Sequence, residues 1–149
     1  PRVASSRVRR KLGDAALPRR AKLGEVLVSA HSGGFQAAAY AVSRGQVNIR
    51  EIYLFDALYG YSHRFVRWLA KDGQRRLVNI HRGVGLVSRW TDKLIKGLKK
   101  RSIPVTEAIG RARAVIVKTA VPHRDVTWGD DALRRCLETS PLRGVDEVR

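Results

Sequence analysis

The chain has 149 residues, 44% of them hydrophobic, and its 30 Lys and Arg against 13 Asp and Glu give a formal net charge of +17. This length and composition predict one domain with a buried core and argue against a largely disordered chain. No stretch of about 18 apolar residues occurs, so no transmembrane helix is expected. The basic start lacks the apolar middle of a secretory signal, which indicates a cytoplasmic protein. The chain begins with Pro1 and contains no methionine, so we expect a fragment or a processed form.

The positive charge suggests a polyanion as a partner, such as nucleic acid or an acidic membrane surface. Lys and Arg are scattered along the chain, and no aromatic residue interrupts the thickest basic run, residues 93–101. This pattern favours nonspecific adhesion over specific nucleic-acid recognition. The single cysteine, Cys136, cannot form an internal disulfide, and its helical spacing with Leu133 and Leu137 predicts a buried apolar position. No metal site of the Cys/His kind is available, and we expect no cofactor.

The apolar pattern divides the chain into three parts. Residues 1–24 are a basic segment with a possible short peripheral helix before Pro18. Residues 25–140 carry alternating apolar runs and helical patterns, which predict the folded domain. Residues 141–149 form a polar tail.

The first elements of the domain are a strand, a tight turn and a helix. An apolar run at residues 26–28 stops at the small residues 30–34, and apolar residues then recur at helical spacing over 35–42. We expect Gly45 to end this helix in a left-handed conformation. A second apolar run, residues 52–55, ends at Asp56, and residues 57–60 form a loop.

The same alternation continues to the end of the domain. A helix from 61 to about 72 is followed by a strand at 77–80, and a longer helix then has Val87, Trp90, Leu94, Ile95 and Leu98 on its buried face. Residues 114–117 form a fourth strand, and a last helix over 130–137 is capped by Asp130 or Asp131. Short apolar strands alternating with helices predict an α/β fold with three αβα layers and a mostly parallel sheet.

The turn at residues 30–34 carries the first chemical signal. A strand that turns directly into a helix raises the side chain at the turn, and small residues must flank it because the two backbones nearly touch. Gly33 and Gly34 meet this need on one side of Ser32, and Ala30 on the other. The first N–H groups of the new helix favour negative charge beside the serine, so its hydroxyl is a candidate nucleophile. The alternative is an ordinary turn between a strand and a helix.

This turn resembles the nucleophile elbow of the α/β-hydrolases, G-x-S-x-G, written here as Ala-His-Ser-Gly-Gly over residues 30–34. The first glycine is replaced by alanine, as in some lipases of that fold. The resemblance extends over roughly residues 25–137 and implies the carboxyl-terminal half of the α/β-hydrolase fold, without its first strands. It also implies the chemistry of an esterase, lipase or amidase.

Three residues capable of this chemistry follow predicted strands: Ser32 the first, Asp56 the second and His123 the fourth. Parallel strands place these positions at one edge of the sheet, and the order Ser, Asp, His is that of the α/β-hydrolases. Ser32 is then the nucleophile, His123 the general base and acid, and Asp56 the group that orients the imidazole. The Gly33 N–H is expected as one oxyanion donor.

Two departures from the family pattern leave alternatives open. Many members place the acid one strand later, where this chain has no carboxylate, and Asp92 is the second candidate for the role. The family's second oxyanion donor comes from a segment that precedes the nucleophile strand, and residues 1–24 do not resemble it. His31, Tyr59 and Tyr61 are expected to contact substrate, with Trp128 as a further wall of the pocket.

Two readings of function therefore compete. The first is a serine hydrolase that acts through Ser32, Asp56 and His123 and an acyl-enzyme on a small-molecule or acyl substrate. The second is a truncated, non-catalytic α/β module whose basic surface binds polyanions. A doubly wound nucleotide binder fits less well, because the turn lacks the G-x-G-x-x-G spacing and no P-loop lysine follows. Oligomeric state cannot be read from the sequence.

Overall fold

The fold is that of a computed structural model, which describes residue 10 and residues 24–142. The expected peripheral helix within residues 1–24 and most of the expected tail, residues 141–149, lie outside the described residues. Four strands form one sheet in the order β1-β2-β3-β4, and every neighbouring pair is parallel. Their bounds are Val26–His31 for β1, Ile49–Phe55 for β2, Arg76–His81 for β3 and Ala114–Lys118 for β4.

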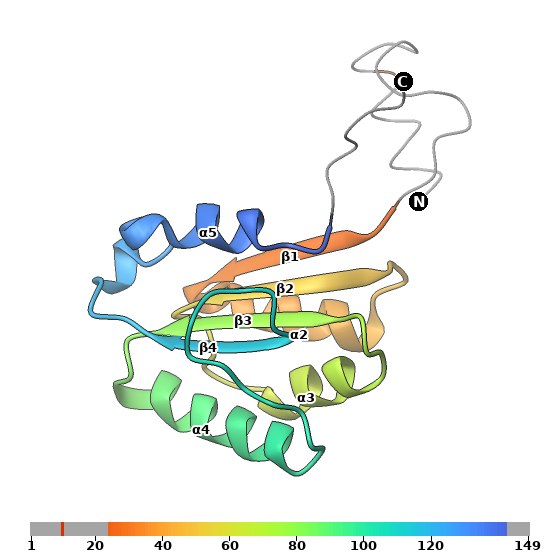
Figure 1. Cartoon of the computed structure of the whole chain (residues 1–149), viewed down its shortest axis with the longest axis horizontal. Helices are drawn as coiled ribbons and strands as arrows, with labels where there is room; N and C mark the ends of the chain where they lie inside the picture. The colour runs from red at the N-terminus through yellow and green to blue at the C-terminus, as the bar shows by residue number, and fades with distance from the viewer. Residues whose placement is uncertain (1–9, 11–23, 143–149) are drawn as a thin grey trace.

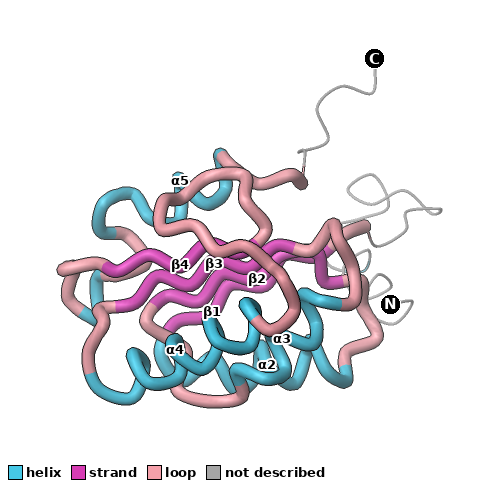
Figure 2. Tube along the Cα trace, turned by 60° about the horizontal axis from the view of Figure 1, so that its bottom comes forward, coloured by secondary structure: helices cyan, strands magenta, loops and turns pink. Residues whose placement is uncertain are grey.

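Helices cover both faces of this sheet, which gives the three layers seen in Figures 1 and 2. One face carries the three helices that connect successive strands, and the other carries the last helix. The bounds are Phe35–Arg44 for α2, Ser62–Ala70 for α3, Gly85–Lys99 for α4 and Ala132–Glu138 for α5. The expected αβα architecture with a parallel sheet is confirmed. None of the helices in the described ranges is long and apolar enough to cross a bilayer.

The alternating direction of side chains along each strand explains why helices cover both faces of the sheet. Successive side chains of a strand point to opposite faces, so a strand that is apolar throughout needs a helix layer on each side. In β2, Ile52 and Leu54 pack towards α2, α3 and α4, whereas Tyr53 and Phe55 pack towards α5. Cys136 is buried in the second of these clusters, as its spacing predicts. Of the expected buried face of α4, Val87, Leu94 and Leu98 are buried, and Trp90 and Ile95 are partly exposed.

Gly45 corrects one prediction. It follows α2 in an extended conformation, with φ −65° and ψ 144°, and not in the left-handed conformation. A Cβ at this position would lie 2.3 Å from the carbonyl oxygen of Ala41. Glycine is needed here because the backbone folds closely over the helix end, and a positive φ plays no part.

The start of α5 lacks the capping hydrogen bond that the sequence predicts. Asp131 is the capping residue by position, but its side chain makes no capping hydrogen bond, and its φ is 54°. Its carboxylate instead accepts a hydrogen bond from Arg134. The ion pair of these two side chains has replaced the expected cap.

A buried polar network fastens the end of α5 to the sheet. Arg76 on β3 donates to Glu51 on β2 at 2.8 Å, and both side chains are almost completely buried. The guanidinium also donates to the Cys136 carbonyl and to the Thr139 hydroxyl. Tyr53 donates to the same carboxylate at 2.7 Å, and burial raises the pKa of its hydroxyl.

Removing one partner of this pair should be costly, because the other charge stays buried without compensation. We expect Arg76→Met to lower the free energy of unfolding by about 3–5 kcal/mol in urea denaturation. The matched control is Arg124→Met, whose largely exposed ion pair with Asp125 should be worth about 1 kcal/mol or less. Equal losses in the two variants would contradict a structural role for the buried pair.

Candidate active site

The serine lies where β1 turns directly into a helix. β1 ends at His31, a 3-10 turn spans Ser32–Gly34, and α2 begins at Phe35. Ser32 has φ 52°, in the left-handed region that non-glycine residues rarely adopt. Such a backbone persists only where the surrounding structure holds it, and it lifts the serine out of the path of both elements.

The small residues around this turn lie close together without a clash. A Cβ built on Gly34 would lie 3.4 Å from the Cβ of Ala30, so these two positions face each other across the turn. A Cβ on Gly33 would meet nothing within 4 Å. These distances correspond to ordinary van der Waals contact or open space, so the room around the turn accommodates alanine at the first position of the pentapeptide.

The strand register brings the second residue beside the first. His31 pairs with Phe55, so Ser32 and Asp56 follow paired residues on neighbouring strands. Asp56 also leaves its strand with a left-handed backbone, φ 42°. Both side chains thus lie at the carboxyl edge of the sheet, which the chain leaves through strained turns.

The loop after β4 brings His123 to the same edge. Its Nε2 lies 3.0 Å from the Ser32 Oγ, and its Nδ1 lies 2.7 Å from the Asp56 Oδ2. The three residues form a continuous chain of hydrogen bonds. Asp92, the alternative acid, is exposed on α4, and the imidazole is bonded to Asp56 instead.

The Asp56 carboxylate is buried and fully engaged. Its side chain is 2% exposed. Oδ1 accepts from the Arg82 backbone N–H at 3.1 Å, and Oδ2 accepts from the Arg82 guanidinium at 2.9 Å as well as from His123. Burial alone would raise the pKa of Asp56, but these hydrogen bonds and the positive charge of Arg82 outweigh burial and lower it. Asp56 is therefore ionised at neutral pH.

An ionised acceptor fixes the protons of the histidine. The carboxylate can only accept, so the Nδ1 of His123 carries a proton, and in the neutral ring Nε2 is then the free acceptor. Ser32 donates its hydroxyl proton to that nitrogen. The hydrogen bond thus runs from the serine hydroxyl to the imidazole, which is the direction that general-base activation of a serine needs.

His31 holds the histidine loop in place. Its Nε2 lies 2.7 Å from the carbonyl oxygen of His123, and the two rings are 4.7 Å apart between centroids. A carbonyl only accepts, so Nε2 is the protonated nitrogen of His31. His31, expected to contact substrate, thus fixes the backbone of His123.

The two tyrosines differ in their relation to this edge. Tyr59 packs on Phe35, 5.8 Å between ring centroids, and burial together with the negative charge of Asp56 raises its pKa. Tyr61 packs farther along α2, between the rings of Phe35 and Tyr40. Trp128, the further candidate, is 71% exposed on the loop that follows His123.

Arg82 is the site residue that the sequence did not reveal. It follows β3, at the same edge of the sheet as Ser32, Asp56 and His123. This position after a strand was the only feature of the sequence that could have indicated a role in the site. The neighbouring His81 is buried, and burial lowers its pKa, so it adds no positive charge beside Asp56. Among the described residues at the end of β3, Arg82 is therefore the one that places a positive charge beside the Asp56 carboxylate.

The turn also offers backbone donors. The first N–H groups of a helix have no partner within the helix, and Gly33 and Gly34 occupy these positions after Ser32. Their side of the turn is open, since both glycines are exposed. Within the described residues, no group of three or more His, Cys, Asp and Glu is placed to hold a metal ion.

No protein-family model, curated protein or solved structure matches this chain.

The lowered pKa of Asp56 gives its contribution to stability a definite pH dependence. Because the pKa is below the usual 3.8, the ionised carboxylate stabilises the fold above that pH, and the contribution is lost as the pH falls through the folded pKa. We expect the wild type to be more stable than Asp56→Asn at pH 7, with the difference shrinking below about pH 4. Urea denaturation at a series of pH values measures this difference.

Asp130→Asn is the matched control, because Asp130 also has a left-handed backbone but is exposed. Asparagine tolerates that conformation, so neither substitution strains the backbone. Asp56→Asn also replaces an oxygen that accepts from Arg82 or His123 with an NH₂ donor, whereas the Asp130 carboxylate is exposed. The control should differ little from the wild type at any pH. A difference for Asp56→Asn that stays constant from pH 7 to pH 3 would refute the role given to its ionised form.

Proposed function

We propose that this protein is a serine hydrolase of the α/β-hydrolase type that cleaves carboxylic esters or amides through an acyl-enzyme. The observation that carries the proposal is the chain of two hydrogen bonds from Ser32 through His123 to a buried, ionised Asp56. The left-handed turn at Ser32 and the order of the three residues along the chain support it.

The first half of the reaction forms the acyl-enzyme. The Ser32 Oγ attacks the carbonyl carbon of the substrate while its proton passes to the Nε2 of His123. The resulting imidazolium lies against the Asp56 carboxylate, which stabilises its charge. The oxygen of the tetrahedral intermediate takes up negative charge, and the Gly33 N–H donates to it.

Collapse of the intermediate breaks the bond to the leaving group. His123 returns the proton to the leaving alkoxide or amine, and the acyl group stays on Ser32 as an ester. Water then enters, and His123 takes one of its protons as the oxygen attacks the acyl carbon. The carboxylic acid leaves, and Ser32 regains its proton from His123, so no oxidant or cofactor is consumed.

Arg82 has a positioning role in this proposal. Its guanidinium and its backbone N–H hold both oxygens of Asp56, leaving one lone pair of Oδ2 directed at His123. His31 acts from the other end of the same loop by fixing the His123 carbonyl. The imidazole is thus fixed at two points besides its bond to the serine.

Labelling by a fluorophosphonate, with mass spectrometry to locate the adduct, tests the proposal. We expect one adduct, on Ser32, that is lost in Ser32→Ala. In His123→Ala the labelling rate should fall by about 100-fold or more, because general-base help is typically worth 10²–10⁴.

Ser102→Ala is the matched control, because Ser102 shares the left-handed backbone of Ser32, with φ 54°, and is more exposed than Ser32. Labelling should be unchanged in this variant. A folded wild-type protein that takes no adduct, or that is labelled on another serine, would reject the proposal and favour the non-catalytic reading.

A further inference from the structure

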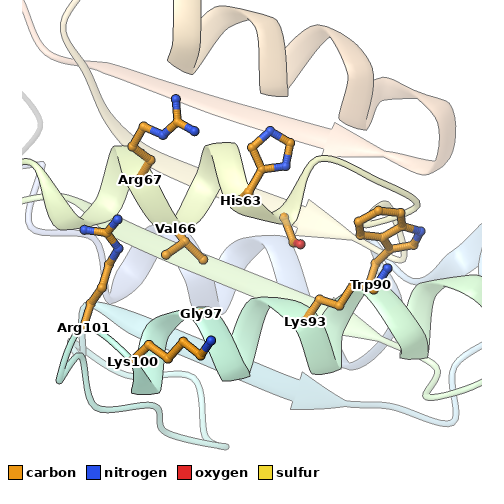
Figure 3. A pocket seen from close by; sticks show the side chains of 9 residues that line it. His63, Val66, Arg67, Trp90, Lys93, Gly97, Lys100 and Arg101 are labelled. Carbon is orange, nitrogen blue, oxygen red and sulfur yellow. The ribbon is translucent and has the colours of Figure 1, made fainter.

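A basic groove lies between α3 and α4, on the helix layer of the sheet (Figure 3). It is a cavity of about 650 Å³. Ser62, His63, Val66 and Arg67 line it from α3, and Trp90, Lys93, Gly97, Lys100 and Arg101 line it from α4 and the residues that follow.

The groove follows from the close approach of the two helices. A Cβ on Gly97 would lie 2.8 Å from a methyl carbon of Val66, so glycine lets α4 pack directly on α3. The long side chains on either side of this contact then project outward from two helices that lie together. In Figure 3 the cations stand along both rims of the groove, with Trp90 near one end.

The charge of the groove is strongly unbalanced. Arg67, Lys93, Lys100 and Arg101 are exposed along it, and no acidic residue lines it. Every ion pair found within the described part of the chain involves other residues. Lys96 and Lys99 extend the basic surface around α4 into a second hollow that shares Lys100 and also contains Asp92.

We propose that this groove binds single-stranded nucleic acid. A row of cations along a groove matches a ligand with repeated negative charges, and each phosphate contact releases counterions. An aromatic ring within such a groove provides a surface on which a base can stack. The Lys93 ammonium lies 4.0 Å from the centre of the Trp90 ring. A base that stacks on this face of the ring therefore displaces Lys93, whose ammonium can then contact the phosphate next to that base.

The shape of the site favours a single strand over a duplex. Duplex DNA is read by protein elements that enter its grooves, whereas a groove in the protein admits a single strand. A membrane surface fits less well, because membrane-binding surfaces carry several large apolar side chains among their cations, whereas the groove has one large aromatic side chain, Trp90. The large apolar side chains exposed in the described ranges lie outside the groove lining: Tyr40, Val47, Val84, Leu86, Trp128 and Leu137.

Sequence alone did not suggest this site. The basic run at 93–101 contains no aromatic residue; Trp90 precedes it by one turn of α4, and Arg67 and His63 join it only through the packing of α3 on α4. The helix pair therefore turns a solvated lysine face into a groove with an aromatic end.

Fluorescence anisotropy with a labelled oligothymidylate tests the proposal on two matched variants. The groove variant is Arg67→Ala/Lys93→Ala/Lys100→Ala, and the control is Arg44→Ala/Arg111→Ala/Arg135→Ala, which removes three exposed arginines elsewhere. Both lower the net charge by three. We expect the dissociation constant to rise by about tenfold or more in the groove variant and by less than about threefold in the control. The slope of the logarithm of the association constant against the logarithm of the salt concentration should become shallower by about two in the groove variant. Thermal unfolding by circular dichroism verifies that both variants are folded.

A second variant, Trp90→Phe, keeps the charge and reports on stacking. Oligothymidylate should quench the tryptophan fluorescence of the wild type, and this quenching should fall in Trp90→Phe. Several outcomes would overturn the proposal: no binding by the wild type, equal weakening in the two triple variants, equal affinity for a duplex of the same length, or binding to phosphatidylserine vesicles but not to the oligonucleotide.

Discussion

The buried carboxylate of Asp56 joins the three segments on which the candidate site depends. It follows β2, accepts hydrogen bonds from Arg82 after β3, and accepts another from His123 after β4. A buried carboxylate is costly unless it is paired and hydrogen-bonded, so these partners must all stay in place for the site to exist. The same bonds that make burial possible also fix the proton on His123.

The parallel sheet supplies the geometry for this interaction. Neighbouring strands in register end at one edge, so Ser32 and Asp56 lie side by side without any long-range adjustment of the chain. Each of them leaves its strand in a left-handed conformation, which costs free energy for a residue other than glycine. The packed sheet and its helices on both faces hold these two strained turns.

Much of this arrangement was predictable because it depends on local patterns. The strand runs, the small residues at 30–34 and the positions of Asp56 and His123 at strand ends are all visible in the sequence. Arg82 and His31 were harder to assign, since their roles come from hydrogen bonds to Asp56 and to the His123 backbone across the sheet edge. The prediction for Gly45 was wrong because a glycine after a helix can serve close packing as well as a positive φ.

The basic groove in the helix layer was also hard to predict from the sequence, because it too depends on tertiary contacts. The lysine-rich face of α4 is visible in the sequence, but the residues of α3 come beside it only through the packing of the two helices, which includes the contact of Gly97 with Val66. The carboxyl edge of the sheet and the basic groove thus lie on different parts of one scaffold. Strand order and register determine most of the first, whereas the second combines α4 with residues of α3 that only tertiary packing brings beside it.

The ionised Asp56 fixes the proton on His123 Nδ1 and leaves Nε2 to accept from Ser32. ¹⁵N NMR of histidine-labelled protein at neutral pH measures this tautomer directly. We expect a protonated Nδ1, seen as a downfield proton resonance that is lost in Asp56→Asn, and an unprotonated Nε2. A neutral His123 with its proton on Nε2 would rule out this arrangement, because the ring could not then take the proton of Ser32.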